Sequence, residues 1–348
     1  MVVSKSVSRK LLIAAGASLA TVGLLAGCTS GAPTPETTSG GEETGGGDET
    51  GETVVIGFSG PAADHGWLGA INSAAIAEAA KYPDIELKVA EGTNDANLQI
   101  SQVETFVNEG VDAIVLLPTD GAALTEAAIA AMNAGVPVVN VDREFSSPFA
   151  ARTTILGDNY GMGVSAGTYI CEQLGDNPDA VVAEIAGIDS LPLTQDRSAG
   201  FADALSDCGL SVSNRVAADF TVAGGEAVTS QLLSAAPKID AIWNHDDDQG
   251  IGVLAAINAA GRDEFFMVGG AGSANAMREI QSGESVLQAT VIYPSTQAAD
   301  GIRLARLIAQ GKVMSDLVEA AVPARIVLFA PVVTADNVDE FLPTAFES

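Results

Sequence analysis

The sequence is poor in basic residues, in histidine and in cysteine, and each shortage excludes a class of function. Among 348 residues there are 16 Lys and Arg against 45 Asp and Glu, so the formal net charge is -29. A charge of this sign repels phosphate, and no basic stripe reverses it locally, which excludes nucleic acid as a partner. Two histidines and three cysteines leave no zinc signature, and we expect neither a metal nor a cofactor.

Aromatic residues are also scarce, at 5% of the chain, whereas 47% of the residues are hydrophobic and 37 are glycine. This hydrophobic content excludes a wholly disordered acidic chain. Many small residues and few aromatics suit a packed α/β protein with tight turns. The length is sufficient for two modest domains, which we favour over one.

The N-terminus predicts export. Three basic residues precede an apolar run over residues 11–25, which has the length of a signal-peptide core and is short for a membrane span. The next residues complete the sequence Leu25-Ala26-Gly27-Cys28. It resembles the lipobox of bacterial lipoproteins, in which the cysteine is acylated and becomes the new N-terminus. We expect a signal peptide over residues 1–27 and a lipid on Cys28; the alternative is an uncleaved anchor helix with a chance cysteine.

Residues 28–52 are rich in Gly, Thr and acidic residues and contain no large apolar side chain, so we expect a flexible tether. The folded part is then predicted to start at Thr53. With Cys28 acylated, Cys171 and Cys208 remain as one pair outside the cytoplasm. An oxidising compartment permits a disulfide between them, and the sequence leaves open whether it forms.

Short β-branched runs alternate with alanine-rich stretches of helical period from Val54 onward, which predicts an α/β fold with parallel sheets. Several runs are apolar on both faces, as expected where helices cover both sides of a sheet. The predicted strands are 54–58, 85–90, 113–117, 136–141, 181–185, 212–216, 241–243 and 265–268.

An internal repeat divides the folded part. The pattern that starts at Asp112 and ends in an apolar strand recurs from Asp240, about 125 to 128 residues later. This offset has the size of a domain, so it predicts two similar doubly wound lobes; the alternative is a chance likeness between two alanine-rich helices. Facing lobes place the carboxyl ends of two sheets around one crevice, where open α/β folds bind ligands.

Polar and aromatic side chains follow the predicted strands, as expected for such a crevice. Carboxylates and guanidinium groups bind hydroxyls, and aromatic rings pack on the C–H faces of a sugar, so the set predicts a neutral polyhydroxylated ligand. Structural roles remain alternatives: helix capping for Asp64, Asp158, Asp196 and Asp247, ion pairing for Arg143 and Arg197, and a core position for Trp67. The candidate segments are Ser59 to Trp67, Asp142-Arg143, Asp158-Asn159, Gln195 to Arg197, Asp219-Phe220 and Asn244 to Gln249.

Three motifs that are typical of other functions have weaker support. Residues 163–167 match a nucleophile elbow around Ser165, but they fall inside a predicted helix. Residues 161–166 match a dinucleotide fingerprint, but a soluble nicotinamide cofactor is not expected outside the cell. We expect the small residues there to let the helix pack closely on the sheet. The carboxylates at residues 246–248 lack the glycine and the closing acid of a calcium loop.

Taken together, these segments resemble the type I periplasmic sugar-binding proteins, in particular the ribose- and galactofuranose-binding branch that serves ABC importers. The resemblance covers nearly all of residues 53–330. Its markers are residues 53–59, 138–143, 157–159, 196–201 and 218–220, and the Asp246-Asp247 pair. It implies two lobes that close over a sugar, joined by three strands crossing near residues 155, 293 and 325. We expect one lobe from residues 53–155 and 294–324 and another from residues 156–293 and 325–348.

The resemblance also implies which residues contact the ligand. Two departures from the family pattern leave the ligand's identity open. Relatives place an aspartate where this chain reads Gly269-Gly270-Ala271-Gly272, and they place a glutamine where it reads Ile292-Tyr293. The implied contacts are Asp64, Trp67, Asp142, Arg143, Arg197, Phe220 and Asp246, with Ser59, Asn159 and Tyr293 as further candidates.

We therefore predict a monomeric, non-enzymatic lipoprotein on the outer face of the bacterial cytoplasmic membrane. It captures a monosaccharide or a related polyol and delivers it to an ABC transporter permease. One alternative is a receptor of the same fold that signals to a membrane partner. Another is an exported hydrolase, which needs Ser165 with His245 or a carboxylate pair in the cleft.

Overall fold

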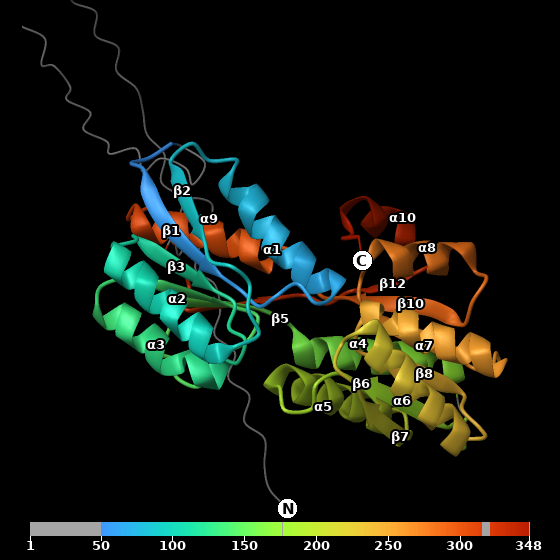
Figure 1. The fold of residues 1–348 in the computed structure, drawn as a ribbon. Coiled ribbons are helices and arrows are strands. Elements are labelled where there is room, and N and C mark those ends of the chain that lie inside the picture. The colour runs from blue at the N-terminus through green and yellow to red at the C-terminus, as the bar shows by residue number, and fades with distance from the viewer. Residues whose placement is uncertain (1–49, 176, 315–320, 348) are drawn as a thin grey trace, which may run out of the picture. The chain divides into compact units, whose positions relative to one another are not determined.

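The computed structural model describes residues 50–175, 177–314 and 321–347. The predicted signal peptide, Cys28 and all but the last residues of the predicted tether lie outside these residues. Within them, strands alternate with helices and form two six-stranded sheets (Figure 1). The two sheets define the N-terminal lobe and the C-terminal lobe, and the predicted α/β class with two similar lobes is confirmed.

The N-terminal lobe contains a wholly parallel sheet in the order β11-β5-β4-β3-β1-β2. Its strands are β1 (Val54–Ser59), β2 (Ile85–Val89), β3 (Ala113–Leu116), β4 (Val138–Val141), β5 (Thr153–Gly157) and β11 (Arg325–Leu328). Its helices are α1 (Gly66–Ala79), α2 (Ala96–Glu109), α3 (Gly121–Asn133) and α9 (Gln297–Ala309).

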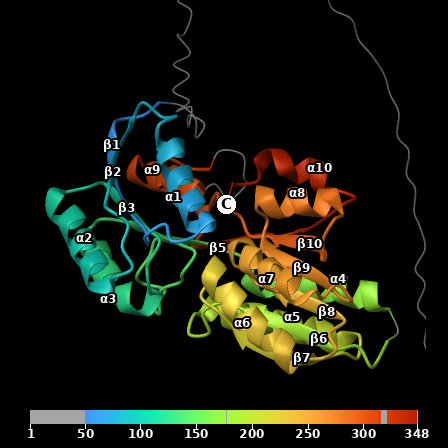
Figure 2. The same ribbon diagram turned by 45° about the vertical axis from the view of Figure 1, so that its right-hand side comes forward.

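The C-terminal lobe contains the sheet β12-β10-β9-β8-β6-β7 (Figure 2). Its strands are β6 (Val182–Ala186), β7 (Val212–Ala217), β8 (Ala241–Asn244), β9 (Phe266–Ala271), β10 (Leu287–Ile292) and β12 (Val332–Thr334). Its helices are α4 (Asn159–Leu174), α5 (Pro192–Asp207), α6 (Val222–Ala235), α7 (Asp247–Ala260), α8 (Ala274–Ser282) and α10 (Val338–Phe341), followed by the 3-10 turn η1 (Leu342–Thr344).

The two sheets have the same strand order, and this explains the internal repeat. β3 and β8, which begin directly after Asp112 and Asp240, hold the same position in their sheets. The sheets differ at one edge, where β12 runs antiparallel to β10 but β11 runs parallel to β5. The predicted repeat is therefore a repeat of topology as well as of sequence.

The chain passes between the lobes at β5 to α4, at β10 to α9 and at β11 to β12. The third crossing lies later than predicted. Residues 325–328 pair with β5 through regular parallel bonds, which makes them part of the first sheet, and the crossing follows at residues 329–331. The boundary expected at residue 325 is thus shifted by the strand pairing, a feature that hydrophobic periodicity alone does not reveal.

Each sheet is covered on both faces. In the C-terminal lobe, Phe201 of α5 and Trp243 of β8 are fully buried on one face, with ring centroids 4.7 Å apart. On the other face, Val253 of α7 packs in a separate cluster with Ile242. The N-terminal lobe is built in the same way, with α1 and α9 on one face and α2 and α3 on the other.

Side chains cap several helices, but not all those predicted to do so. The Asp158 carboxylate accepts a hydrogen bond from the Gly161 N–H at the start of α4, as predicted. Asp196 instead lies inside α5, and the residue before α1 is His65, which makes no side-chain capping bond. Asp196 is not a capping residue because α5 begins at a proline four residues before it, and proline suits the first helical turn.

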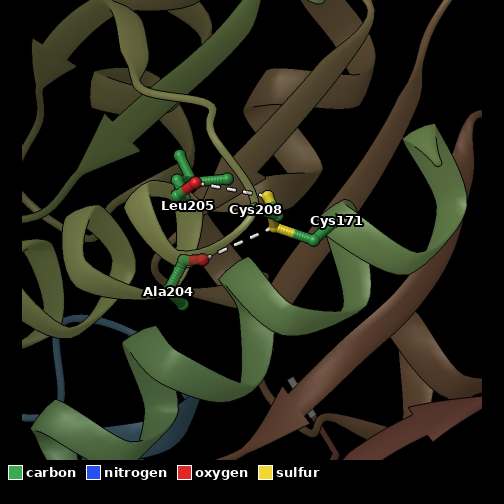
Figure 3. The surroundings of a disulfide bond; sticks show 4 residues. All are labelled: Cys171, Ala204, Leu205 and Cys208. Carbon is green, nitrogen blue, oxygen red and sulfur yellow. Dashed lines mark hydrogen bonds between the residues drawn. A yellow bond between two sulfur atoms is a disulfide. The ribbon is translucent and has the colours of Figure 1, made fainter. Parts of the chain in front are cut away.

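Helices α4 and α5 pack unusually closely. A Cβ atom on Gly163 would lie 2.0 Å from the carbonyl oxygen of Arg197, and one on Gly200 would lie 2.1 Å from that of Tyr160. The small residues of α4 therefore allow close contact with a neighbouring helix, whereas we had expected close contact with the sheet. Cys171 near the end of α4 forms a disulfide with Cys208 after α5 (Figure 3).

Candidate functional site

A cavity lies between the lobes, at the carboxyl ends of the strands. Its walls come from the segments that follow β4, β7, β9 and β10 and from the first turns of α1, α5 and α7. This arrangement follows from the parallel sheets, since the carboxyl ends of parallel strands meet at one edge. The lining residues are His65, Trp67, Asp142, Arg143, Leu193, Arg197, Phe220, Asp246, Ala271 and Tyr293.

Seven of the predicted ligand residues line this cavity: Trp67, Asp142, Arg143, Arg197, Phe220, Asp246 and Tyr293. Asn159 lies directly behind them, because its amide contacts both Arg197 and Tyr293. Trp67 combines both of its predicted roles. It is 5% exposed and belongs to the hydrophobic core, yet it also lines the cavity.

Two predicted residues lie elsewhere. Ser59 is fully buried, and its hydroxyl donates to Gln102 at 2.9 Å and accepts from Gln99 at 3.1 Å. Asp64 lies at the surface, where it accepts a hydrogen bond from Asn94 and contacts His65 Nδ1 at 2.7 Å. Neither residue lines the cavity, because its polar atoms already have partners on neighbouring segments.

Tyr293 connects the walls of the cavity. Its hydroxyl donates to Asp142 Oδ1 at 2.6 Å and accepts from Asn159 Nδ2 at 3.1 Å. Its backbone carbonyl accepts from Trp67 Nε1 at 3.0 Å. Burial and the nearby Asp142 raise the pKa of the Tyr293 hydroxyl, so this group stays protonated and remains a donor. Its ring packs directly on Gly157, where a Cβ atom would collide with it.

The two arginines approach the cavity from opposite lobes. Arg143 donates through Nη1 to the Thr119 carbonyl at 2.7 Å, and its Nε has no hydrogen-bond partner within the described part of the chain. Arg197 donates through Nε to Asn159 and through Nη1 to the His245 carbonyl, at 2.8 and 3.1 Å. Its guanidinium lies 4.4 Å from the centroid of the Tyr293 ring. Of the two arginines, Arg143 fits the ion-pairing alternative better than Arg197, because its Nε lies 3.9 Å from Asp142 Oδ2.

The three consecutive aspartates at the start of α7 have different roles. Asp246 caps the helix by accepting from the N–H groups of residues 248 and 249, a role we had predicted for Asp247. Asp247 holds the turn after β9, and Asp248 accepts from the Trp67 N–H of the other lobe at 3.1 Å. Burial raises the pKa of Asp246 well above its usual range, and that of Asp247 to about 7.

The backbone is strained at this cavity. Among the residues that the structure describes, the non-glycine residues with positive φ are Asp142, Phe220 and Ala271, at +64°, +68° and +96°. All three line the cavity. Such conformations are costly for residues other than glycine, and they persist only where the surroundings impose them, which is common at functional sites.

Sequence reasoning missed three lining residues as ligand contacts. His65 was grouped with the first loop without a role of its own, and Ala271 was noted only as a departure from the family pattern. Leu193 was not singled out, because an apolar residue in the first turn of a helix gives no polar signal. Leu193 follows β6 in the chain, just as the other lining segments follow their strands, and this position could have indicated that it lines the cavity.

The sequence of this chain matches a known protein family. Residues 56–313 match the family model described as periplasmic binding protein domain. The chain belongs to the periplasmic binding proteins. This membership places the protein outside the cytoplasm, in a group of solute-binding proteins.

Relatives of this periplasmic binding protein have names that refer to sugars. The ribose import binding protein of Bacillus subtilis is 33% identical over 234 residues, which are 65% of this chain and 74% of that one. The galactofuranose-binding protein YtfQ of Escherichia coli is 30% identical over 214 residues, 60% of this chain and 67% of that one. A solved structure from Mycobacterium smegmatis, in complex with β-D-fucofuranose, matches with a TM-score of 0.75 at 25% identity, covering 84% and 95% of the two chains.

The residues considered for hydrolysis have other partners in this binding protein. Ser165 lies within α4 and donates to the Ala330 carbonyl at 3.1 Å. His245 is fully buried, with Nε2 3.0 Å from a Glu184 oxygen that also accepts from Ser198. The Glu184 carboxylate thus lies between Ser198 and His245, and the Ser165 hydroxyl donates to a backbone carbonyl rather than to this histidine.

Among the residues that the structure describes, no group of three or more His, Cys, Asp or Glu side chains is arranged to hold a metal ion. No helix in that part of the chain has both the length and the apolar character needed to cross a membrane.

Proposed function

We propose that this protein captures a neutral monosaccharide or a related polyol in the cavity between its lobes and delivers it to the permease of an ABC transporter. The observation that carries the proposal is the lining of the cavity. Asp142 and Arg143 from one lobe face the same space as Arg197 and Asp246 from the other. The names of the ribose- and galactofuranose-binding relatives support the same class of ligand.

The chemistry of the walls suits a sugar. The carboxylate of Asp142 accepts hydrogen bonds from hydroxyl groups, and the guanidinium groups of Arg143 and Arg197 donate to them in plane. Trp67 and Phe220 offer ring faces to C–H groups. Because both lobes contribute contacts, a bound ligand has more contacts when the lobes are closed and so shifts the protein toward that form.

The proposal also covers the location of the protein at the membrane. A lipid on Cys28, outside the described residues, attaches the chain to the outer face of the membrane, and residues 29–52 supply reach. The protein acts as a monomer in this proposal, since one chain supplies both walls of the cavity. The closed form then presents a surface that a permease recognises.

Thermal unfolding tests ligand capture. The full chain, solubilised in detergent, is heated with pentoses, hexoses, sugar alcohols and inositols, each in large excess. A ligand at ~1,000 times its dissociation constant adds about 4 kcal/mol to the free energy of unfolding, which gives a clear rise in Tm. No shift with any member of the panel contradicts the proposal.

Arg197→Ala then tests the site by calorimetry with the sugar that gives the largest shift. We expect binding to weaken by about 2 kcal/mol or more, because ligand hydroxyls and the Asn159 amide lose a charged donor. Arg215→Ala is the matched control. Arg215 lies on β7, pairs with Asp189 and does not line the cavity, so its removal leaves the affinity unchanged.

A further inference from the structure

The last three residues of β9 and the residue that follows it contain one side chain among three glycines. A Cβ atom on Gly269 would lie 2.5 Å from the Asp247 carboxylate, and one on Gly270 would lie 2.6 Å from the His245 carbonyl oxygen. On Gly272 it would lie 2.9 Å from the Ile292 side chain. No side chain fits at these three positions without displacing a neighbour. The fourth position is Ala271, which is 3% exposed and lines the ligand cavity.

The conformation of Ala271 is imposed by its surroundings. The carboxylate of Asp247 accepts hydrogen bonds from the N–H groups of Gly270, Gly272 and Ser273, at 3.0, 2.8 and 2.7 Å. These bonds fix the backbone on both sides of Ala271, whose φ is +96°. Glycine, asparagine and aspartate adopt positive φ more readily than alanine. The backbone therefore does not explain why an alanine occupies this position.

The side chain of Ala271 offers the ligand no hydrogen bond. Ala271, Leu193 and Phe220 are apolar residues of the cavity lining, whereas Asp142, Asp246 and the two arginines are its charged residues. A sugar hydroxyl placed against the methyl group loses its water without gaining a partner, which costs binding energy. A ligand carbon without a hydroxyl has no such cost and gains contact with the methyl group.

We propose that Ala271 is a specificity-determining residue and that the ligand is a deoxy sugar, which presents a carbon without a hydroxyl group to this methyl. The inference rests on the proposed function, because it names the class of sugar for the same cavity. It predicts discrimination between sugars that differ by a single hydroxyl group.

Matched pairs of sugars test it by calorimetry. The pairs are D-fucose with D-galactose, L-rhamnose with L-mannose, and 2-deoxy-D-ribose with D-ribose. We expect the wild-type chain to bind the deoxy member of at least one pair about ten to a hundred times more tightly, the range for one unpaired hydroxyl in an apolar site. Ala271→Asp supplies an acceptor and should reverse the preference within that pair.

Three control variants accompany Ala271→Asp. Ala271→Gly relieves the positive φ without adding an acceptor, so it should raise Tm by roughly 2 to 4 °C and keep the deoxy preference. Ala271→Asn also suits positive φ, and it replaces Ala271→Asp if the buried charge prevents folding. Ala227→Asp adds the same charge on the exposed face of α6 and should leave the preference unchanged.

The outcomes separate the two proposals. If the wild-type chain binds sugars but prefers the hydroxylated member of every pair, or shows no preference, the inference is wrong and the proposed function stands. The inference is also wrong if Ala271→Asp and Ala271→Asn both retain the deoxy preference. If no sugar of the pairs or of the wider panel binds, the proposed function itself fails.

Discussion

The hydroxyl of Tyr293 lies 2.6 Å from Asp142 Oδ1 in the N-terminal lobe and 3.1 Å from Asn159 Nδ2 in the C-terminal lobe. One buried oxygen atom thus joins both lobes next to the crossing segments of the chain. Because its pKa is raised, the hydroxyl remains a donor to the carboxylate over the whole physiological range.

Tyr293→Phe should lower the free energy of unfolding by about 1 to 3 kcal/mol, because it leaves a buried carboxylate without its donor. Denaturant unfolding at neutral pH measures the change. Tyr160→Phe is the matched control: its hydroxyl also donates to an aspartate, Asp203 at 2.7 Å, but on the exposed face of α4. Equal losses in the two variants would show that the buried bond has no special role.

Gly163→Ala tests the close packing of α4 on α5. The new methyl group would lie 2.0 Å from the carbonyl oxygen of Arg197, so α5 must shift and carry Arg197 with it. We expect a loss of about 1 to 3 kcal/mol in stability, together with weaker sugar binding. Thermal unfolding and calorimetry measure the two effects.

Gly69→Ala serves as its control. Gly69 also lies in a helix, α1, but the nearest atom to its added Cβ is the Ala63 Cβ at 3.8 Å. Alanine favours helix more than glycine, so this variant should gain up to about 1 kcal/mol. A gain in both variants would contradict the assigned role of Gly163.

Parallel strands bring their following loops to one edge, and for this reason the segments that contain Trp67 and Asp246 were predicted to face one crevice. The family resemblance then selected these two residues, and both line the cavity. The same rule misplaced Ser59 and Asp64. Their side chains turn toward partners on other segments, and a strand pattern contains no information about such partners.

The aspartate run shows a second limit. Three identical residues at consecutive positions cap a helix, hold a turn and bind the opposite lobe. Their order along the chain gives no means to distinguish these roles, because each depends on which N–H groups the fold brings near. β9 also extends to Ala271 through two glycines, which are rare in strands and ended the predicted strand too early.

Removal of the disulfide should destabilise the C-terminal lobe. Cys171 and Cys208 are 37 residues apart, and the chain-entropy model gives about 4 kcal/mol for a loop of this size. Cys171→Ala combined with Cys208→Ala should lower Tm accordingly. Dithiothreitol should lower the Tm of the wild-type chain to the same value and leave the double variant unchanged; an effect on the double variant would point to another cause.

The buried pair of His245 and Glu184 should make stability depend on pH. Burial lowers the pKa of His245 from its ordinary 6.5 to about 4. Between these values the unfolded chain binds a proton that the folded chain excludes, so stability falls as the pH drops from 6.5 to 4. At 1.36 kcal/mol per pKa unit the fall amounts to about 3 kcal/mol. Asp246, whose pKa is raised, acts in the opposite direction.

His245→Gln isolates this contribution, because glutamine keeps a donor toward Glu184 and does not titrate. Denaturant unfolding at several pH values between 4 and 7 compares the two chains. The variant should be less stable at pH 7, because the Trp243 ring, whose centroid lies 4.1 Å from that of the imidazole, loses this contact. Its free energy of unfolding should nevertheless fall less on acidification than that of the wild-type chain. Asp246 is present in both chains, so its contribution to the pH dependence cancels in the difference. Parallel curves would mean that His245 takes up its proton in the folded state and that its burial does not control acid stability.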